Sequence, residues 1–243
     1  MPSEFTKIQN HLNNIQAWTH DNQMKLNVSK SNFIIFTRSK TDFALRLTME
    51  NNNIERLSAI KLLGVWISED LSWDLNCQET CKKAYKRISL LTKLKYVGVP
   101  TSDLVTIYCL FIRSCLEYCS VVFHPSLTKQ QSDMYERVQK ICLKVILSPH
   151  YVDYESALLT CNLSLLSQRR EDRCLSYSLK CTQHQKHRKM FPLSETFLNN
   201  THNVRNPQKY KVNFAKTEAY RMSSVPYCQR KLNSFWTEQQ SRD

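Results

Sequence analysis

The stretch that decides the fold is "SAIKLLGVWISEDLSWD", from Ser58 to Asp74, because the hydrophobic period changes across it. Upstream of it, apolar residues alternate or form short β-branched runs, as they do in strands. Downstream of it, apolar residues recur every three or four positions, as on one face of a helix. Strands first and helices afterwards is the order of a segregated α+β protein. We therefore expect an α+β fold, with a mainly helical bundle after about residue 72.

The first 72 residues are expected to hold a small helix and three or four strands. Apolar residues at spacings of three and four predict a buried helix face, formed by Phe5, Ile8, Leu12, Ile15 and Trp18. The solid apolar run 33–36 predicts a buried strand, and further strands are expected at 43–49 and 60–68. The polar segment 50–55 supplies a turn, so we expect these strands to pair mostly as antiparallel hairpins.

Helices are predicted for most of the chain after residue 72. The first covers 76–96 and stops at Gly98. The second runs from Thr101 to Pro125 and is apolar nearly all round, so we expect it to be the most buried element. The core face of the first is predicted to consist of Cys81, Ala84, Tyr85, Ile88 and Leu91.

A third helix is expected before Pro149, followed by a short helix near 153–161 and a longer one near 164–182. The remainder is short, basic segments interrupted by prolines. The core face of the third helix is predicted to be Met134, Val138, Ile141, Cys142 and Val145. The expected organisation is a strand-containing region at 1–72, a helical bundle at 73–184 and a basic, partly irregular tail at 185–243.

Positive charge is gathered in segments of the chain, whose formal net charge is +13. Residues 76–100 hold six Lys or Arg and one Glu, and 168–190 and 204–231 are similarly basic. Clustered basic charge indicates a polyanionic partner, most often nucleic acid. The alternative is a set of solvated helix faces. Glycine-rich phosphate loops are excluded, because the chain has only two glycines.

The chain contains ten cysteines, which could form disulfides in a secreted protein or remain free thiols inside the cell. Many of them lie in apolar periodic runs, where a free thiol acts as a small hydrophobe, and the polar N-terminal segment does not look like a signal peptide. We therefore expect an intracellular protein, in the nucleus or cytoplasm, that is not secreted and keeps its thiols reduced. Arg113 and Glu117 interrupt the apolar run from Leu104 to Phe123, so no membrane span is expected.

Several segments together resemble reverse transcriptases of non-LTR (LINE-type, jockey-like) retrotransposons. "IQAWTHDNQMKLNVSKSNFIIFTRS" (15–39) is similar to their motif D, at Trp18, Asn22, Met24, Leu26, Asn27 and Lys30. "KLLGVWISEDLSW" (61–73) resembles motif E, the primer grip. Residues 81–147 resemble the thumb and post-thumb helices, and 163–181 and 220–233 resemble the end of such a reading frame. The resemblance covers nearly the whole chain, as a palm remnant, a thumb and a tail.

The resemblance implies roles for specific residues. Gly64 would let a hairpin backbone approach a primer strand, with Leu63 and Val65 beside it; a β-bulge or a tight packing contact is the alternative. Lys30 would correspond to the motif D general acid in a complete enzyme, or is simply an exposed lysine at a strand edge. Contacts to nucleic-acid phosphates would come from Lys82, Lys83, Lys86, Arg87, Lys93 and Lys95.

The metal-binding aspartates of such polymerases are not found in this sequence. The two-metal chemistry requires an Asp from motif A and a pair from a Y-x-D-D turn, and the chain contains no adjacent Asp pair. The nearest look-alike, "YVDY" at 151–154, has one Asp, and we interpret Asp153 as a helix cap. The chain would begin just after motif C. Mg²⁺ is expected only for a complete polymerase, and no cofactor or metal site is assigned to this chain.

Other motifs give weaker signals. Cys174, Cys181, His184 and His187 lack the paired Cys-x2-Cys spacing of a zinc site, so zinc binding is disfavoured. Cys77/Cys81 and Cys115/Cys119 are four apart on predicted helices without a second pair, and we interpret them as buried thiols. His124 has no nucleophile and orienting acid to form a hydrolase triad with. Tyrosines interleave with the basic residues as a stacking surface would, at Tyr85, Tyr96, Tyr108 and Tyr118, although Tyr108 and Tyr118 are expected to face the core.

The sequence therefore predicts a polymerase fragment that binds template–primer nucleic acid, an RNA–DNA hybrid or a duplex, without polymerising alone. The alternative is a helical interaction protein, or a gene-prediction fragment with no selected function. Strands that lack sheet partners would make the first 70 residues the weak part of such a fragment. The oligomeric state is left open.

Overall fold

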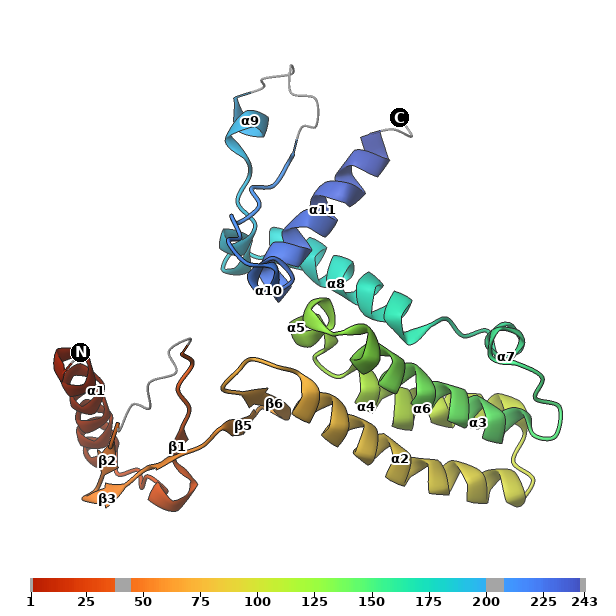
Figure 1. Cartoon of the computed structure of the whole chain (residues 1–243), viewed down its shortest axis with the longest axis horizontal. Coiled ribbons are helices and arrows are strands. Elements are labelled where there is room, and N and C mark those ends of the chain that lie inside the picture. Colours follow the sequence, from red (N-terminus) through yellow and green to blue (C-terminus); the bar gives the residue numbers. More distant parts are fainter. Residues whose placement is uncertain (1, 38–44, 200–207, 241–243) are drawn as a thin grey trace. The chain divides into compact units, whose positions relative to one another are not determined.

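The computed structural model describes residues 2–37, 45–199 and 208–240, which form an α+β protein of helices and short strands (Figure 1). The chain divides into two compact units, Met1–Asn76 and Cys77–Asp243. The strands named below all belong to the first unit. The expected α+β class is therefore confirmed.

The first unit opens with helix α1 (Pro2–Asp21), as predicted. Its contact face was predicted wrongly, because Ile8, Ile15 and Trp18 are exposed. Of the predicted face, Leu12 packs against the core of Leu47, Met49 and Ile54, and the polar Gln9 contacts a strand beside it. The Gln9 amide donates to the carbonyl of Thr48 (2.8 Å) and accepts from its N–H (3.0 Å), so it binds the strand backbone as a neighbouring strand would. The amide thus satisfies strand backbone groups that an apolar side chain would leave unpaired.

The strands of the first unit are short and make three separate two-stranded ladders. Two ladders are antiparallel, as expected for most of the strands, and the ladder of β1 with β4 is parallel, which was not expected. A small core of Leu47, Met49 and Ile54 lies beside them. The strands are β1 (Asn32–Phe33), β2 (Thr48–Met49), β3 (Asn52–Asn53), β4 (Glu55–Arg56), β5 (Ala59–Leu62) and β6 (Val65–Ser68).

The predicted buried strand at 33–36 is largely wrong. Strand β1 stops at Phe33, and Phe36 is exposed. The last bond of the ladder runs from Leu57 N to Phe33 O (2.9 Å). After Leu57 the chain that follows β4 continues into β5, so it no longer pairs with residues 34–36. Of the strand predicted at 43–49, residues 43 and 44 lie outside the described residues.

Gly64 lies in the two-residue turn between β5 and β6. Leu63 and Gly64 both have positive φ, +47° and +91°, as a type I′ hairpin turn requires at its two central positions. The glycine is therefore explained by the turn, and a β-bulge is not what the structure shows at this position. The expected hairpin is confirmed.

The second unit is helical. Its larger helices pack against one another, with α8 against both α6 and α11 (Figure 1). In chain order the elements are α2 (Asp74–Tyr96), α3 (Thr101–Ile107), a π-helical turn η2 (Tyr108–Arg113), α4 (Ser114–Glu117), α5 (Ser120–Phe123), η3 (His124–Ser126), α6 (Lys129–Leu147), α7 (Tyr154–Thr160), α8 (Leu166–Gln183), η4 (His187–Met190), α9 (Glu195–Leu198), α10 (Glu218–Arg221) and α11 (Ser224–Gln240).

The helix predicted from Thr101 to Pro125 is neither continuous nor the most buried element. It contains the π turn η2 and is interrupted at Cys119, which has a φ of +52°. Leu110 is 73% exposed, and Tyr118, expected in the core, is 55% exposed. Its inner residues, such as Ile112, are fully buried, so the segment has one packed face and one open face.

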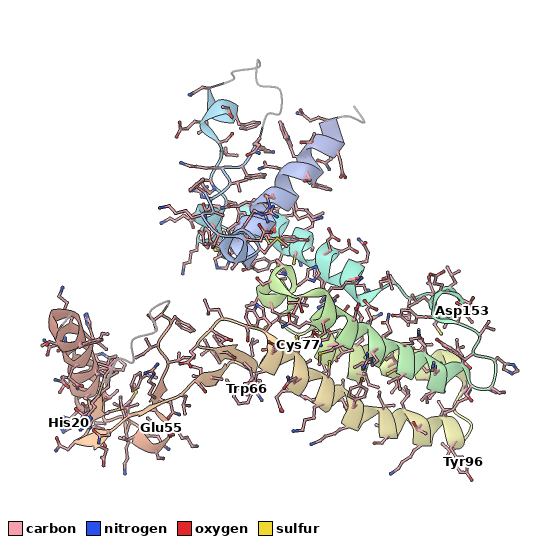
Figure 2. The ribbon with its side chains drawn as sticks, viewed as in Figure 1. His20, Glu55, Trp66, Cys77, Tyr96 and Asp153 are labelled. Atoms are coloured by element: carbon pink, nitrogen blue, oxygen red, sulfur yellow. The ribbon has the colours of Figure 1, made fainter. Side chains whose placement is uncertain are left out.

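The later helices follow the sequence more closely. Asp153 caps α7 by accepting from Ser156 N (2.8 Å), which confirms its assignment as a cap (Figure 2). On α6 the buried stripe includes Tyr135 and Gln139 in addition to the predicted Val138 and Cys142, so the core face is rotated from the predicted one. Helix α11, which the sequence did not predict, packs on α8 around Cys174, Cys181, Phe191, Cys228 and Leu232.

Candidate nucleic-acid interface

Helix α2 carries its buried and its basic residues on opposite faces. Because each residue turns the helix by about 100°, residues three, four and seven apart share a face. Tyr85 was predicted to lie with the buried residues but is 40% exposed. The buried stripe consists of Cys77, Cys81, Ala84, Ile88 and Leu91.

Lysines occupy the opposite face of α2, and we call Lys82, Lys83, Lys86 and Lys93 the lysine row. All four side chains are exposed. Lys82 lies 3.4 Å from Glu79, in an exposed ion pair that contributes little to the stability of the fold. Within the described residues, no ion pair is recorded for the other three lysines. The row therefore presents ammonium groups that are available to an anionic partner.

Arg87 and Lys95 are engaged inside the second unit. The Arg87 guanidinium lies 4.3 Å from the Phe111 ring centroid and donates to the Phe111 carbonyl. The Lys95 ammonium donates to the carbonyl of Ile146 (2.8 Å), at the C-terminal end of α6. A cation at this position satisfies a carbonyl of the last helical turn and opposes the helix dipole. Of the six basic residues expected to contact phosphates, these two therefore have structural contacts.

The other expected contact residues belong to the first unit. At the hairpin turn Leu63 is 84% exposed, whereas Val65 is buried. Lys30 is exposed and ends the 3₁₀ turn η1 (Val28–Lys30), which Asn27 caps. The structure therefore places Lys30 just before strand β1 as an exposed lysine, and within residues 2–37, 45–199 and 208–240 no ion pair or side-chain hydrogen bond is recorded for its ammonium group.

The tyrosines do not form one stacking surface. Tyr108 is buried, as predicted, and donates to Gln139 Oε1 (2.5 Å). Tyr96 is 92% exposed at the end of α2 (Figure 2). Tyr85 is half exposed between α2 and α6, where the charge of Arg137 partly offsets the rise in its phenol pKa that burial causes.

The cysteine and histidine residues considered for zinc are separated. Cys174 and Cys181 point into the core between α8 and α11. His184 and His187 are exposed, and their rings lie against each other at a tilt of 33°, with centroids 4.4 Å apart. Within the described residues no group of three or more His, Cys, Asp or Glu side chains is placed to hold a metal ion.

The sequence patterns did not predict a buried ion cluster centred on Glu117. Glu117 is 1% exposed and lies 2.6 Å from Arg169 Nε and 2.9 Å from Arg173 Nη2. The hydrogen bond to Glu117 raises the pKa of Arg169 further. An acid inside an apolar run signals that a cationic partner must lie nearby, and the basic segment of α8 supplies it. The cluster fastens α4 to α8.

One segment has the length and apolar composition of a membrane-spanning helix, Thr101–Ser126. About a quarter (28%) of its most apolar window is buried in the described structure. By itself one such helix is weak support for a span, because core helices of water-soluble proteins pass the same criteria. Its Glu117 is held by arginines of α8.

Comparison with known proteins gives no relative for this chain: no family model, no curated protein and no solved structure matches it.

Proposed function

We propose that the chain binds double-stranded nucleic acid through the lysine row of α2. The observation that carries the proposal is the position of Lys82, Lys83, Lys86 and Lys93 opposite the buried stripe of the same helix. With a rise of 1.5 Å per residue, the row from Lys82 to Lys93 spans about 16 Å. A duplex presents about one phosphate charge per 1.7 Å of its axis, so the row is long enough to meet several phosphates.

The contacts supplied by such a row are to the nucleic-acid backbone. Flexible ammonium groups contact phosphate oxygens and carry no sequence information. Tyr85 is 40% exposed at the edge of the row, but a single tyrosine is not the series of aromatic side chains on which successive single-stranded bases stack, which favours a paired backbone as the ligand. The resemblance to retrotransposon reverse transcriptases supports an RNA–DNA hybrid or a duplex template–primer as the ligand.

Polymerisation is not part of the proposed function. The sequence contains no adjacent Asp pair, and metal-dependent nucleotide transfer requires carboxylates that hold two metal ions. We therefore propose that Mg²⁺ and the general-acid role of Lys30 belong to a complete polymerase, of which this chain would be the motif D, motif E and thumb part. Residues Leu63 and Gly64 of the exposed hairpin turn would then approach the primer.

The test is the salt dependence of binding to a short RNA–DNA hybrid. Four phosphate contacts predict a slope of log K against log salt of about −3 to −4. Reversal of Lys82, Lys83 and Lys86 to Glu should bring this slope close to −1 and lower the affinity at least about 100-fold at low salt. Because all three side chains are exposed, the variant should fold like the parent protein.

The matched control places the same charge change elsewhere. Lys180, Lys186 and Lys189 are also exposed and lie on or just after α8. Their reversal to Glu lowers the net charge by the same amount, so it should weaken binding only through the general field. Equal losses in the two triple variants would contradict a binding site on α2 and leave net charge as the cause.

A further inference from the structure

An exposed apolar ridge lies beside the lysine row in the second unit. We define the ridge as Leu90, Leu110, Phe111 and Tyr118. Leu110 is 73% exposed and Tyr118 is 55% exposed. Leu110, Phe111 and Tyr118 lie on the open face of the segment whose inner face is fully buried. Soluble proteins scatter single exposed apolar residues, whereas several on one helical segment indicate a candidate interaction site.

Phe111 connects the ridge to the side of α2 that carries Lys83, Lys86 and Arg87. The Arg87 guanidinium lies 4.3 Å from the Phe111 ring centroid, so Phe111 lies against the side of α2. Arg87 follows Lys83 by one helical turn and directly follows Lys86 in sequence. Leu90 continues the same side of α2 one turn later. Phe111 and Leu90 thus lie beside the positively charged side of α2.

We propose that the ridge and the lysine row together dock on the surface of an anionic membrane. Leu110 and Phe111 would enter the boundary between headgroups and acyl chains, and the lysines would contact anionic headgroups. Protruding apolar residues flanked by lysines are the composition of interfacial membrane contacts. This inference goes beyond the proposed function and shares only the lysine row with it.

The observations favour surface docking over a transmembrane span. The inner face of the Thr101–Ser126 segment is packed in the helical unit, with Leu104, Ile112 and Leu116 fully buried. Glu117 in the same segment is bound to two arginines of α8. A span would have to break these contacts, whereas docking uses only side chains that are already exposed.

The positive charge of this surface also indicates which kind of partner it can bind. A second copy of the chain would bring the same basic row against this surface, and like charges oppose such pairing. An acidic amphipathic helix would match the charge, but it binds in a groove, and the most exposed ridge residue, Leu110, projects outward with 73% of its surface accessible. An anionic, deformable surface accepts a protruding side chain.

The experiment is co-sedimentation of the whole chain with lipid vesicles. Vesicles of phosphatidylcholine with about one third phosphatidylserine should bind the protein, and pure phosphatidylcholine vesicles should bind it much less. Leu110→Gln should lower the partition coefficient about 10-fold, because it removes one inserted apolar side chain. Leu110→Trp should preserve or strengthen binding. Reversal of Lys82, Lys83 and Lys86 to Glu should lower the partition coefficient about 100-fold or more.

The same variants separate this inference from the proposed function. Leu110→Gln should leave the affinity for an RNA–DNA hybrid unchanged, because the ridge offers no group to phosphates. The membrane proposal is overturned if Leu110→Gln weakens the binding of vesicles and of the RNA–DNA hybrid equally, or if the parent protein does not bind vesicles. Neither result contradicts the nucleic-acid proposal. A dimer that Leu110→Gln dissociates, or binding to an acidic amphipathic peptide without binding to vesicles, also overturns it.

Discussion

The Nε atom of Arg170 lies 3.3 Å from Nδ1 of His124, so a buried guanidinium donates to an uncharged imidazole. Arg170 is fully buried, and its Nη2 donates to Ser132 Oγ at 2.9 Å. Its guanidinium also lies 5.1 Å from the centroid of the Tyr135 ring. The Nδ1 atom of a histidine accepts a hydrogen bond only when it carries no proton. Burial of the imidazole, and secondarily the charge of Arg170, lower the pKa of His124 from 6.5 to about 4, which agrees with a neutral ring that accepts this bond.

The first prediction is a loss of stability in mild acid that depends on His124. Well above pH 6.5 the imidazole is neutral in both the folded and the unfolded chain, so it adds no pH dependence there. As the pH falls from 6.5 toward 4, the unfolded chain binds the proton first, so the free energy of unfolding decreases. We expect a decrease on the order of 1–3 kcal/mol, measured by urea unfolding at several pH values.

Two variants isolate the contribution of His124. His124→Asn retains an acceptor for Arg170 and cannot be protonated, so its unfolding free energy should depend less on pH over the same range. His150 is exposed, and His150→Asn should leave the profile of the parent protein unchanged. If the His124→Asn profile is as steep as that of the parent protein, other groups cause the pH dependence.

The second prediction concerns the ion cluster between α4 and α8. Glu117→Gln removes the negative charge and leaves Arg169 and Arg173 facing each other without a counter-ion. Breaking a buried ion pair in this way should lower the free energy of unfolding by about 3 kcal/mol, measured by chemical denaturation. Asp103 is exposed, so Asp103→Asn should change stability by less than about 0.5 kcal/mol. Equal effects would show that Glu117 is not an important contact.

The third prediction tests the end of α2. Gly98 has a φ of +83° and closes the helix through bonds from its N–H to Lys95 O and from Val99 N to Leu94 O, both 3.1 Å. A Cβ at this position meets no atom within 4 Å, so Gly98→Ala is penalised by backbone conformation alone, by about 1 kcal/mol. Gly98→Asn should cost less, because Asn adopts the left-handed region more easily. Thermal denaturation of the three proteins checks this order.

Sequence periodicity predicted helices best where their buried faces are apolar. On α2 the apolar stripe from Cys81 to Leu91 predicted the helix correctly. It failed for α11, whose buried face includes Gln229 and Asn233. Gln229 accepts from Asn213 N (2.8 Å), and Asn233 exchanges hydrogen bonds with the backbone of Tyr210. These amides satisfy backbone groups of the preceding segment, a long-range requirement that hydrophobic periodicity does not contain.

The candidate site was predictable only in part for a similar reason. The positions of Lys82, Lys86 and Lys93 opposite the apolar stripe follow from helical spacing alone. The engagement of Lys95 depends on where the last carbonyls of α6 lie, and that of Arg87 depends on the packing of Phe111. Both contacts depend on tertiary structure. A count of charged residues in the sequence therefore treats Lys95 and Arg87 as available for binding, although they are engaged inside the protein.

The fourth prediction compares the two units by hydrogen exchange. The first unit has a small core, and its ladders are two to four residues long. The amide of Ile54, which donates to Leu47 O at 2.8 Å, lies in this unit. Its exchange should be faster than that of buried amides in α6, because short ladders open locally at low free energy. Slower exchange at Ile54 than in α6 would contradict the expectation that the first 70 residues are the weak part.

The fifth prediction separates a folded nucleic-acid-binding unit from a fragment without a packed core. Cys81 and Cys142 are buried, and burial raises the pKa of each thiol to about 12. Because alkylating reagents attack the thiolate, these two thiols should react with iodoacetamide at neutral pH only when the second unit opens. Cys115 is only half buried and should react at least about 100-fold faster, as measured by peptide mass spectrometry. In urea all three should react alike. Equal rates already in buffer would mean that α2 and α6 do not pack together, and the lysine row would then have no rigid helix to display it.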